Sequence, residues 1–231
     1  MSKPSLNLLV LGPGKTGSLV AEVARERGHQ ALIVDVDVNR DGAWLTPEHL
    51  RDFDVVVDFT SPEAVLTNIE ACVRAKQAMV VGTTGWYSEM ARVRSAVEQA
   101  GMGFVFAANF SYGVNLFFQI MKAAAPALTH GYSGHITEIH HIHKKDAPSG
   151  TAVAMQRVLE QAVGVRVDIT SEREGEVTGT HALELDATGD CIVLTHAAKS
   201  RRTFAEGAVL AAEWIVGKIG FYDFKDIFGK L

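Results

Sequence analysis

The stretch Leu8–Gly28, LLVLGPGKTGSLVAEVARERG, decides the fold of the first half of the chain. An apolar run leads into a glycine-rich turn, and an amphipathic segment follows the turn. Gly12, Gly14 and Gly17 have the spacing G-x-G-x-x-G at this junction. In a strand–turn–helix unit, such glycines permit a tight turn, a close approach of the backbone to a pyrophosphate, and close packing of helix on strand. The stretch therefore predicts the start of a dinucleotide-binding domain; the alternative is an ordinary turn.

Short apolar runs and amphipathic segments continue to alternate up to about residue 108. Such alternation is typical of a parallel sheet with helices on both faces. After the second apolar run the pattern of a crossover helix is weak, and only TPEHL has a helix start. Thr46 would be its N-cap and Pro47 its first helical residue. We therefore expect a shortened crossover at this point.

From Gly113 the pattern changes to that of a second unit. It predicts an apolar helix to about Leu128 and a helix over 151–163. The strand-like runs are 135–142, 165–174, 180–187 and 191–198. Four strands with one helix between them indicate an α+β unit with a mixed sheet. An alanine-rich helix over 205–218 and the tail FYDFKDIF close the chain.

The predicted fold is thus an α/β Rossmann-type dinucleotide-binding domain, residues 1–108 and 205–231, and a second domain. That second domain, residues 109–204, is an α+β substrate-binding and oligomerisation domain with a four-stranded mixed sheet. Because only one evident helix covers this sheet, one apolar sheet face would be exposed. An exposed apolar face of this kind indicates an interface with other protein chains.

Composition excludes several classes of protein. The 231 residues are 47% hydrophobic, which is enough for a sizeable core, and the net charge of -5 offers no basic face for nucleic acid. No apolar run approaches the roughly 20 residues of a membrane span, and the N-terminus lacks a signal-peptide pattern, so we expect a cytoplasmic protein without membrane contact. Cys72 and Cys191 make no metal knuckle or disulfide framework, and we interpret both as small core residues.

The ends of the predicted parallel strands supply further cofactor-binding candidates. Asp35, at the end of the second strand, suits a ribose hydroxyl, and Asp37 is the alternative if the strand ends later. DFTSPE and VGTTG put small polar residues after two more strands, and AANFSYG follows the next. Ligands of open α/β sheets lie outside the carboxyl ends of the strands, so these loops should line one crevice. We therefore expect a nicotinamide dinucleotide site.

The choice between the two nicotinamide dinucleotides depends on the charges near the ribose. Asp35 favours the free 2'-hydroxyl of NADH, whereas Lys15 and Arg40 could accept the 2'-phosphate of NADPH. We therefore expect either NADH or NADPH to serve as cofactor, with NADH at least as good.

A second motif, EIHHIHKKDAPSGTA over 138–152, gathers histidines and lysines in an acidic protein. In a regular strand Glu138 and His140 face one way and His141 the other, and we expect the chain to leave the sheet near His141. The helix that begins near Ser149 has no acid in its first turn, so its N-terminus is open to an external anion. The motif therefore predicts a carboxylate or phosphate receptor, with Lys144 as a source of charge or protons.

Two other interpretations of this motif remain. The spacing His-His-x-His could bind a metal, but adjacent lysines would repel a cation, and we predict no metal. The motif could also be a solvated run of charge.

The motif also resembles a signature of the 4-hydroxy-tetrahydrodipicolinate reductases, also called dihydrodipicolinate reductases. Five further segments resemble this family in the same order, so the resemblance spans nearly the whole chain: DFTSPE, VGTTG, FAANFSYGVN, SRRTFAEGAV and WIVGKIGFYDFKDI. It implies a homotetramer that reduces 4-hydroxy-tetrahydrodipicolinate, a cyclic dicarboxylate, to tetrahydrodipicolinate in lysine and diaminopimelate biosynthesis. The alternative is a dinucleotide-binding sensor that keeps the fold without turnover.

The resemblance also implies roles for individual residues. His140 and Lys144 would be the catalytic acid/base and proton-donating groups, and His141, Gly150 and Thr151 would bind substrate carboxylates. The expected cofactor-binding residues, from the motifs and the resemblance together, are Gly12, Gly14, Lys15, Thr16, Gly17, Asp35, Phe59, Thr60, Gly82, Thr83, Thr84, Ala107, Ala108, Asn109 and Phe110.

Overall fold

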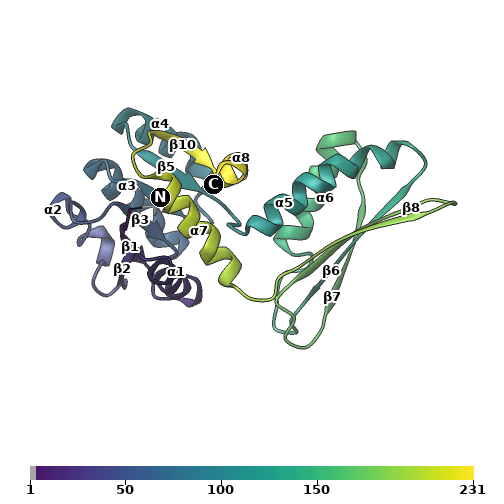
Figure 1. Cartoon of the computed structure of the whole chain (residues 1–231), viewed down its shortest axis with the longest axis horizontal. Helices are drawn as coiled ribbons and strands as arrows, with labels where there is room; N and C mark the ends of the chain where they lie inside the picture. Colours follow the sequence, from purple (N-terminus) through teal and green to yellow (C-terminus); the bar gives the residue numbers. More distant parts are fainter. Residues whose placement is uncertain (1–3) are drawn as a thin grey trace. The chain divides into compact units, whose positions relative to one another are not determined.

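The computed structural model describes residues 4–231 and divides the chain into two compact units (Figure 1). Unit 1 contains the described residues up to Tyr112 together with Arg201–Leu231, and unit 2 contains Gly113–Ser200. The sequence prediction sets these two boundaries at residues 108 and 205. The chain thus leaves unit 1 once and returns to it for its last segment.

In the described residues, unit 1 is built on a six-stranded parallel sheet with the order β10-β5-β4-β3-β1-β2. Its strands are β1 Asn7–Leu11, β2 Gln30–Val34, β3 Val55–Asp58, β4 Met79–Val81, β5 Gly103–Phe106 and β10 Gly220–Asp223. Its helices are α1 Lys15–Glu26, α2 Pro47–Leu50, α3 Pro62–Ala75, α4 Met90–Ala100, α7 Arg202–Ile215 and α8 Phe224–Ile227, with short 3-10 turns at Arg40–Gly42, Tyr87–Glu89 and Phe228–Lys230. The Rossmann-type sheet predicted from the sequence is confirmed.

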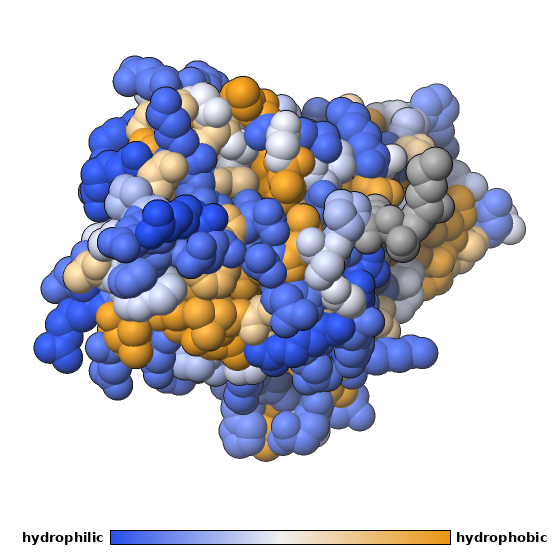
Figure 2. Space-filling view, turned by 60° about the vertical axis from the view of Figure 1, so that its left-hand side comes forward, coloured by the Kyte–Doolittle hydropathy of each residue, from blue (hydrophilic) through white to orange (hydrophobic). Residues whose placement is uncertain are grey.

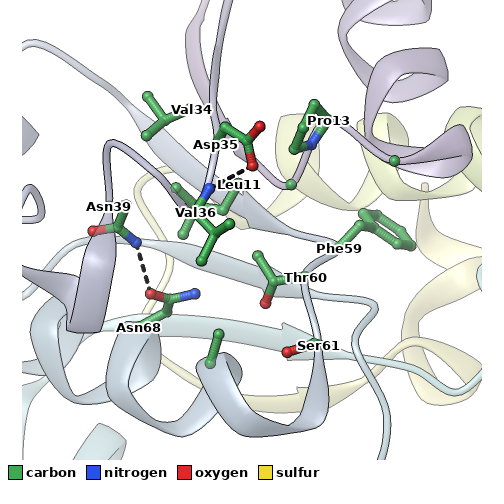
Figure 3. Close-up of a pocket in the computed structure, with 13 residues that line it drawn as sticks. Leu11, Pro13, Val34, Asp35, Val36, Asn39, Phe59, Thr60, Ser61 and Asn68 are labelled. Atoms are coloured by element: carbon green, nitrogen blue, oxygen red, sulfur yellow. Dashed lines mark hydrogen bonds between the residues drawn. The ribbon is translucent and has the colours of Figure 1, made fainter.

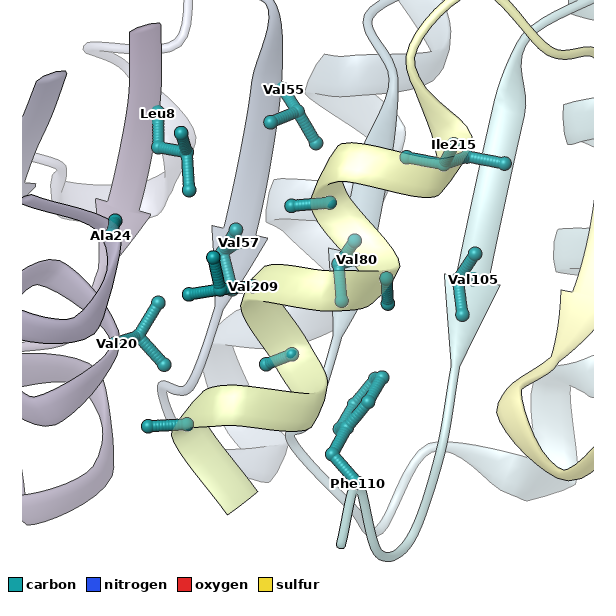
Figure 4. Packing of buried hydrophobic residues seen from close by; sticks show 14 of the residues in the cluster. Leu8, Val20, Ala24, Val55, Val57, Val80, Val105, Phe110, Val209 and Ile215 are labelled. Atoms are coloured by element: carbon teal, nitrogen blue, oxygen red, sulfur yellow. The ribbon is translucent and has the colours of Figure 1, made fainter. Parts of the chain in front are cut away.

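Helix α7 packs beside α1 on one face of this sheet (Figure 4). Val209 and Ile215 of α7 lie against the strand residues Val57, Val80 and Val105, and all five are fully buried. Burial of one aliphatic side chain stabilises a fold by about 1.5–3 kcal/mol, so this layer ties the last part of the chain firmly to unit 1. Helices α3 and α4 contribute buried residues to the core of the other face.

Two details of unit 1 bear on the sequence predictions. The short crossover is confirmed, because α2 has only four residues. As predicted, Thr46 is its N-cap, and the Thr46 hydroxyl accepts a hydrogen bond from the backbone N–H of His49 (3.2 Å). The tail is more than a closing segment, because β10 adds a sixth strand beside β5 and the rings of Phe104 and Phe221 stack 5.1 Å apart. A four-residue strand carries too little periodicity to be predicted alone.

Unit 2 forms the predicted four-stranded mixed sheet, in the order β7-β6-β8-β9. Its strands are β6 Ser133–His140, β7 Asp168–Arg173, β8 Thr180–Asp186 and β9 Cys191–Ala197. Its helices are α5 Tyr112–Ala124, whose first residue belongs to unit 1, and α6 Gly150–Val163, with a 3-10 turn at Ala125–Thr129. Strand β6 runs parallel to β7 and antiparallel to β8.

The two faces of the unit 2 sheet differ in character. Ile136 and Leu183 are fully buried in one core with Met155 of α6 and Met121 of α5, so two helices rather than one cover this face. The residues that alternate with them, such as His135 and Thr137 on β6 and Glu184 on β8, are exposed or half-buried. The predicted apolar character of the uncovered face is therefore wrong, because polar side chains predominate in these alternating positions.

The two cysteines differ in their exposure. Cys72 is buried, as expected, but Cys191 is exposed at the start of the edge strand β9, so its interpretation as a core residue is wrong. Figure 2 shows a surface on which hydrophilic residues alternate with several small hydrophobic patches. Among residues 4–231, the helices are all too short or too polar to cross a membrane.

Candidate active site

The turn between β1 and α1 has the close packing that the glycine spacing predicts. Gly12 has a φ of +94°, and a Cβ at this position would lie 2.4 Å from the carbonyl oxygen of Phe59. A Cβ on Gly17 would lie 2.0 Å from the carbonyl oxygen of Gly12, so α1 rests directly on the turn. Gly14 is the N-cap of α1, whose first turn contains no acidic residue. This helix N-terminus is therefore suited to an anion such as a pyrophosphate.

Three neighbouring cavities of about 290, 280 and 210 Å³ follow the carboxyl ends of the unit 1 strands. Phe59 lines all three of them, and Gly82 lines two. With the exception of Gly17, which lies behind the turn, every expected cofactor-binding residue lines at least one cavity. These residues are Gly12, Gly14, Lys15, Thr16, Asp35, Phe59, Thr60, Gly82, Thr83, Thr84, Ala107, Ala108, Asn109 and Phe110. The loops thus form one extended groove in unit 1.

The largest of these three cavities lies between the end of β2 and the loop after β3 (Figure 3). Asp35 and Val36 face it from one side, and Thr60 and Ser61 from the other. Asp35 directly follows β2, and its carboxylate accepts a hydrogen bond from the N–H of Val36 (2.6 Å). Asp37 does not line this cavity. Of the two acids that the sequence left open, Asp35 is therefore the one that lines this cavity.

A buried carboxylate underlies the loops of this groove. Asp58, at the end of β3, is completely buried and accepts hydrogen bonds from the hydroxyls of Thr60 (2.7 Å) and Thr83 (2.6 Å). Its other oxygen accepts from the side-chain amide of Asn68 (2.8 Å), which in turn accepts from the amide of Asn39 (2.9 Å). Buried polar groups are stable only when they are paired, and here neutral donors pair one carboxylate. The network holds together the loops after β2, β3 and β4.

In unit 2, the buried face of β6 changes from apolar to ionisable along the strand. Ile136, Glu138 and His140 alternate with half-buried residues and share this face, as the sequence pattern predicts for Glu138 and His140. The neighbouring strands continue the change, because Arg173 of β7 lies beside His140 and His181 of β8 lies beside Glu138. The polar end of this core lies where the chain leaves the sheet.

The charges of this cluster are mutually compensated. Glu138 is completely buried, and its two carboxylate oxygens bond the Nδ1 atom of His140 and the guanidinium of Arg173, the latter at 3.0 Å. Burial raises the pKa of Glu138, but its hydrogen bonds and the nearby positive charges outweigh burial and leave this pKa below its usual value. Burial lowers the pKa of His140, and Glu138 opposes that change.

His181 connects the cluster to the start of α6. Its Nε2 atom lies 3.1 Å from the hydroxyl of Ser149, and its ring meets that of His140 edge to face at 5.1 Å. Burial, followed by the charge of His140, lowers the pKa of His181 to about 4. Ser149 also accepts a hydrogen bond from the N–H of Ala152 (3.2 Å) and so caps α6. The helix start near Ser149 is therefore confirmed, and the first turn of α6 carries no acid, as predicted.

Lys144 lies in the loop between β6 and α6, where its ammonium group donates hydrogen bonds to Asp146 (2.7 and 3.0 Å). The hydrogen bond from Lys144 lowers the pKa of Asp146. The guanidinium of Arg173 reaches the same loop and donates to the carbonyl oxygen of Asp146 (2.6 Å). The loop that carries Lys144 is thus attached to β7.

The remaining expected residues of unit 2 lie at the two ends of this loop. His141 is half-buried and follows the last residue of β6, as predicted, and its carbonyl oxygen accepts from the N–H of Lys144 (3.1 Å). Gly150 and Thr151 are the first residues of α6, and the cap of Ser149 does not involve their N–H groups. An anion could therefore still bind at this helix start.

Glu138, His140 and His181 also place possible metal-ligand atoms within 4.8 Å of one another. However, Arg173 already bonds the carboxylate of Glu138, and a cation at this position would face its guanidinium group. This charge arrangement favours an internal hydrogen-bond network over a bound metal ion.

Sequence reasoning missed two residues of this cluster. Arg173 and His181 become neighbours of β6 only through strand pairing, so no local spacing identifies them. Glu138 had a usable signal, because it alternates with His140 inside a strand-like run that continues the apolar face.

Two family models match successive parts of this chain. The family model described as "Dihydrodipicolinate reductase, N-terminus" matches residues 6–110, and the model "Dihydrodipicolinate reductase, C-terminus" matches residues 113–228. The 4-hydroxy-tetrahydrodipicolinate reductase of Christiangramia forsetii is 36% identical, over 98% of this chain and 99% of its own. The enzyme of the same name from Neisseria meningitidis serogroup A is 40% identical, over 78% of this chain and 74% of its own.

Solved structures show the same fold at lower identity. The dipicolinate-bound dihydrodipicolinate reductase from Paenisporosarcina sp. TG-14 matches with a TM-score of 0.79 at 20% identity, covering 97% of this chain and 100% of its own. GenD2 from gentamicin A biosynthesis, solved in complex with NAD, matches with a TM-score of 0.63 at 13% identity, covering 94% and 88%. With both family models and relatives of more than 30% identity covering most of its length, this chain belongs to the dihydrodipicolinate reductase family.

Proposed function

We propose that the protein reduces 4-hydroxy-tetrahydrodipicolinate to tetrahydrodipicolinate with NADH or NADPH, in lysine and diaminopimelate biosynthesis. The observation that carries this proposal is that one chain of this family combines two sites. A dinucleotide-shaped groove lies in unit 1, and unit 2 contains acid/base side chains beside an anion-accepting helix start. Neither site alone would support the reaction.

The groove of unit 1 fits a dinucleotide. Its pyrophosphate would lie on the N-terminus of α1 near Gly14, where the absence of acidic residues and the ammonium group of Lys15 favour negative charge. A ribose would meet Asp35 in the largest cavity. When bound, the reduced nicotinamide supplies a hydride to the conjugated C=N system of the substrate.

The substrate is a cyclic dicarboxylate, and unit 2 offers donors for its carboxylates. Gly150 and Thr151 present the first N–H groups of α6, and His141 adds an imidazole at the other end of the loop. Water is first lost from the 4-hydroxy compound to give dihydrodipicolinate. These donors would then hold its ring while hydride and proton are added.

The chain's own contribution to the chemistry is a proton. Hydride addition brings two electrons to the ring and leaves it electron-rich, and one proton from a side chain completes the reduction. His140 and Lys144 are the candidates, because both are ionisable, adjoin the same loop and lie near the start of α6. The donor is afterwards reprotonated from solvent.

We further propose that both cofactors serve, with NADH at least as efficient as NADPH. Asp35 would accept a hydrogen bond from a free ribose hydroxyl and would repel a 2'-phosphate. Comparing the Michaelis constants of the two cofactors on one preparation tests this choice.

We also propose a homotetramer, as the family resemblance implies. The contacts between copies would use the uncovered, largely polar face of the unit 2 sheet, where Val193 of β9 is 58% exposed. Light scattering at micromolar concentration should give a tetrameric mass, and a monomeric mass would contradict this assembly.

The experiment that tests the function is an assay with enzymatically generated substrate and reduced cofactor. We expect loss of the absorbance of reduced nicotinamide only when substrate is present. Tight binding of NADH without substrate-dependent oxidation would instead support the alternative of a dinucleotide-binding sensor.

A further inference from the structure

We propose that Glu138 and Arg173 form a positioning pair that fixes the ring of His140 and, through the same contacts, the loop that carries Lys144. The proposal rests on the proposed function, in which both of these residues take part in proton transfer. It adds two residues that act through others and do not themselves meet the substrate.

Glu138 and His140 share one face of strand β6. The two residues lie two positions apart on β6 and so point to the same buried face of the sheet. Glu138 is completely buried, and one of its carboxylate oxygens bonds the Nδ1 atom of His140. Because an ionised carboxylate can only accept, Nδ1 must carry the hydrogen. The Nε2 atom is therefore the one left to exchange a proton with a ligand.

A glycine packs against the Nε2 side of this ring. Gly179, at the residue before β8, is buried, and a Cβ at this position would lie 2.9 Å from His140 Nε2. Every side chain other than hydrogen at position 179 would therefore press on the imidazole. Glycine here leaves the ring in the orientation that its bond to Glu138 requires.

Arg173 connects Glu138 to the loop that carries Lys144. Its guanidinium donates to the second carboxylate oxygen of Glu138 (3.0 Å) and to the backbone carbonyl oxygens of Asp146 (2.6 Å) and Lys144 (3.4 Å). A guanidinium has several donors in a rigid plane, so one side chain can hold a strand and a loop together. The buried carboxylate and the loop of Lys144 thus share one partner.

The charge of Glu138 affects the protonation of His140. The ionisable groups that face its ring are Glu138 on its own strand, Arg173 from β7, His181 from β8 and Lys144 from the loop. Burial lowers the pKa of His140, the two cations lower it further, and Glu138 is the group that raises it. Without this carboxylate, the pKa of His140 would be lower still, and a smaller fraction of the ring would be protonated near neutral pH.

The test compares Glu138→Gln with the control Glu160→Gln, which removes an exposed carboxylate from the last turn of α6. We expect the control to behave like the wild type. In Glu138→Gln we expect kcat to fall about 10- to 100-fold while the NADH dissociation constant stays unchanged. We also expect the limb of the pH–rate profile that reports His140 to move to lower pH. Unchanged kcat and an unchanged profile would overturn the proposal.

A second pair of measurements keeps the proposal testable if Glu138→Gln folds poorly. Nitrogen NMR of labelled histidine should show His140 of the wild type as the tautomer with hydrogen on Nδ1, and the Nε2–H tautomer would overturn the proposal without any assay. Arg173→Gln should lower kcat about 5- to 20-fold, and the double variant should be no worse than Glu138→Gln. Multiplicative losses would show that the two residues act independently. A wild type without substrate-dependent oxidation would refute the proposed function instead.

Discussion

The two candidate sites are built in different ways. In unit 1 the groove is shaped by backbone, with turns that pack so closely that only glycine fits at Gly12 and Gly17, and with one carboxylate, Asp58, holding loops through neutral donors. In unit 2 the site consists of ionisable side chains, where Glu138 lies between His140 and Arg173 at the end of a hydrophobic core.

Because of this difference, substitutions in the two sites should change different properties of the protein. A backbone-shaped site binds a ligand by fit, so substitutions there should change stability and affinity. A site made of coupled charges moves protons, so substitutions there should change rates and their pH dependence. The predictions below test this separation in order of expected effect.

The largest effect should come from Lys144→Ala. We expect kcat to fall by about 10²–10⁴, since a positioned proton donor contributes about that much, while NADH affinity stays within about twofold. Steady-state kinetics and an NADH titration measure the two quantities. Lys145→Ala, next to it in the exposed part of the loop, is the control. Equal losses in both lysine variants would show that the loop acts only through its net charge.

The next effect concerns acid stability and His181. Its pKa is about 4 when folded and 6.5 as the reference, so between these values the unfolded chain binds a proton that the folded chain does not. The contribution of neutral His181 is therefore complete above pH 6.5 and is lost as pH falls towards 4, a change on the order of 3 kcal/mol at most.

Urea unfolding followed by circular dichroism at pH 7 and pH 4 measures this loss. We expect His181→Gln to show a weaker decline of the unfolding free energy than the wild type. His130→Gln, which removes an exposed histidine of unit 2, should not. If the unfolding free energy declines equally in all three proteins, the acid sensitivity comes from groups other than His181.

In unit 1, alanine substitutions at Gly17 and Gly14 should differ in their effect on stability, because only Gly17 is closely packed. A Cβ on Gly17 would meet a backbone oxygen at 2.0 Å, whereas a Cβ on Gly14 would meet nothing within 4 Å. We expect Gly17→Ala to cost about 1–3 kcal/mol of unfolding free energy and to weaken NADH binding, because overpacking forces the turn to move. Gly14→Ala should cost less. Urea unfolding followed by tryptophan fluorescence suits this test, since Trp44, Trp86 and Trp214 belong to unit 1. Equal costs would mean that the turn is not held by packing.

The smallest effect should come from Asp35→Ser, which removes the acid of the largest cavity. We expect the ratio of kcat/KM for NADPH to that for NADH to rise about tenfold, as repulsion of a 2'-phosphate is relieved. Asp37→Ser changes a nearby acid outside the cavity and should leave the ratio unchanged. A shift caused by Asp37→Ser alone would assign the ribose to the other acid.

The same difference explains how much could be predicted from the sequence. The groove of unit 1 follows from local spacing, because G-x-G-x-x-G and the strand-end motifs each fix a short piece of backbone at the same edge of a parallel sheet. The short strand β10 was missed because its four residues gain their conformation from pairing with β5.

In unit 2, local spacing located the loop but not the network. Arg173 lies 35 residues from Glu138, and His181 lies 32 residues from Ser149, so these pairs exist only once the strands are in register. Exposure of Cys191 likewise depends on β9 being the edge of the sheet. Tertiary pairing therefore set the features that the sequence did not reveal.

Deuterium transfer tests the central claim, that unit 1 holds the hydride donor while unit 2 supplies the proton. The wild-type protein is given enzymatically generated substrate and reduced cofactor that carries deuterium at the transferable position. We expect one deuterium on a ring carbon of tetrahydrodipicolinate for each cofactor oxidised. With Lys144→Ala we expect little oxidised cofactor and little tetrahydrodipicolinate, despite normal cofactor binding. Oxidation of the cofactor without deuterium in the ring would contradict direct hydride transfer and, with it, this assignment of roles.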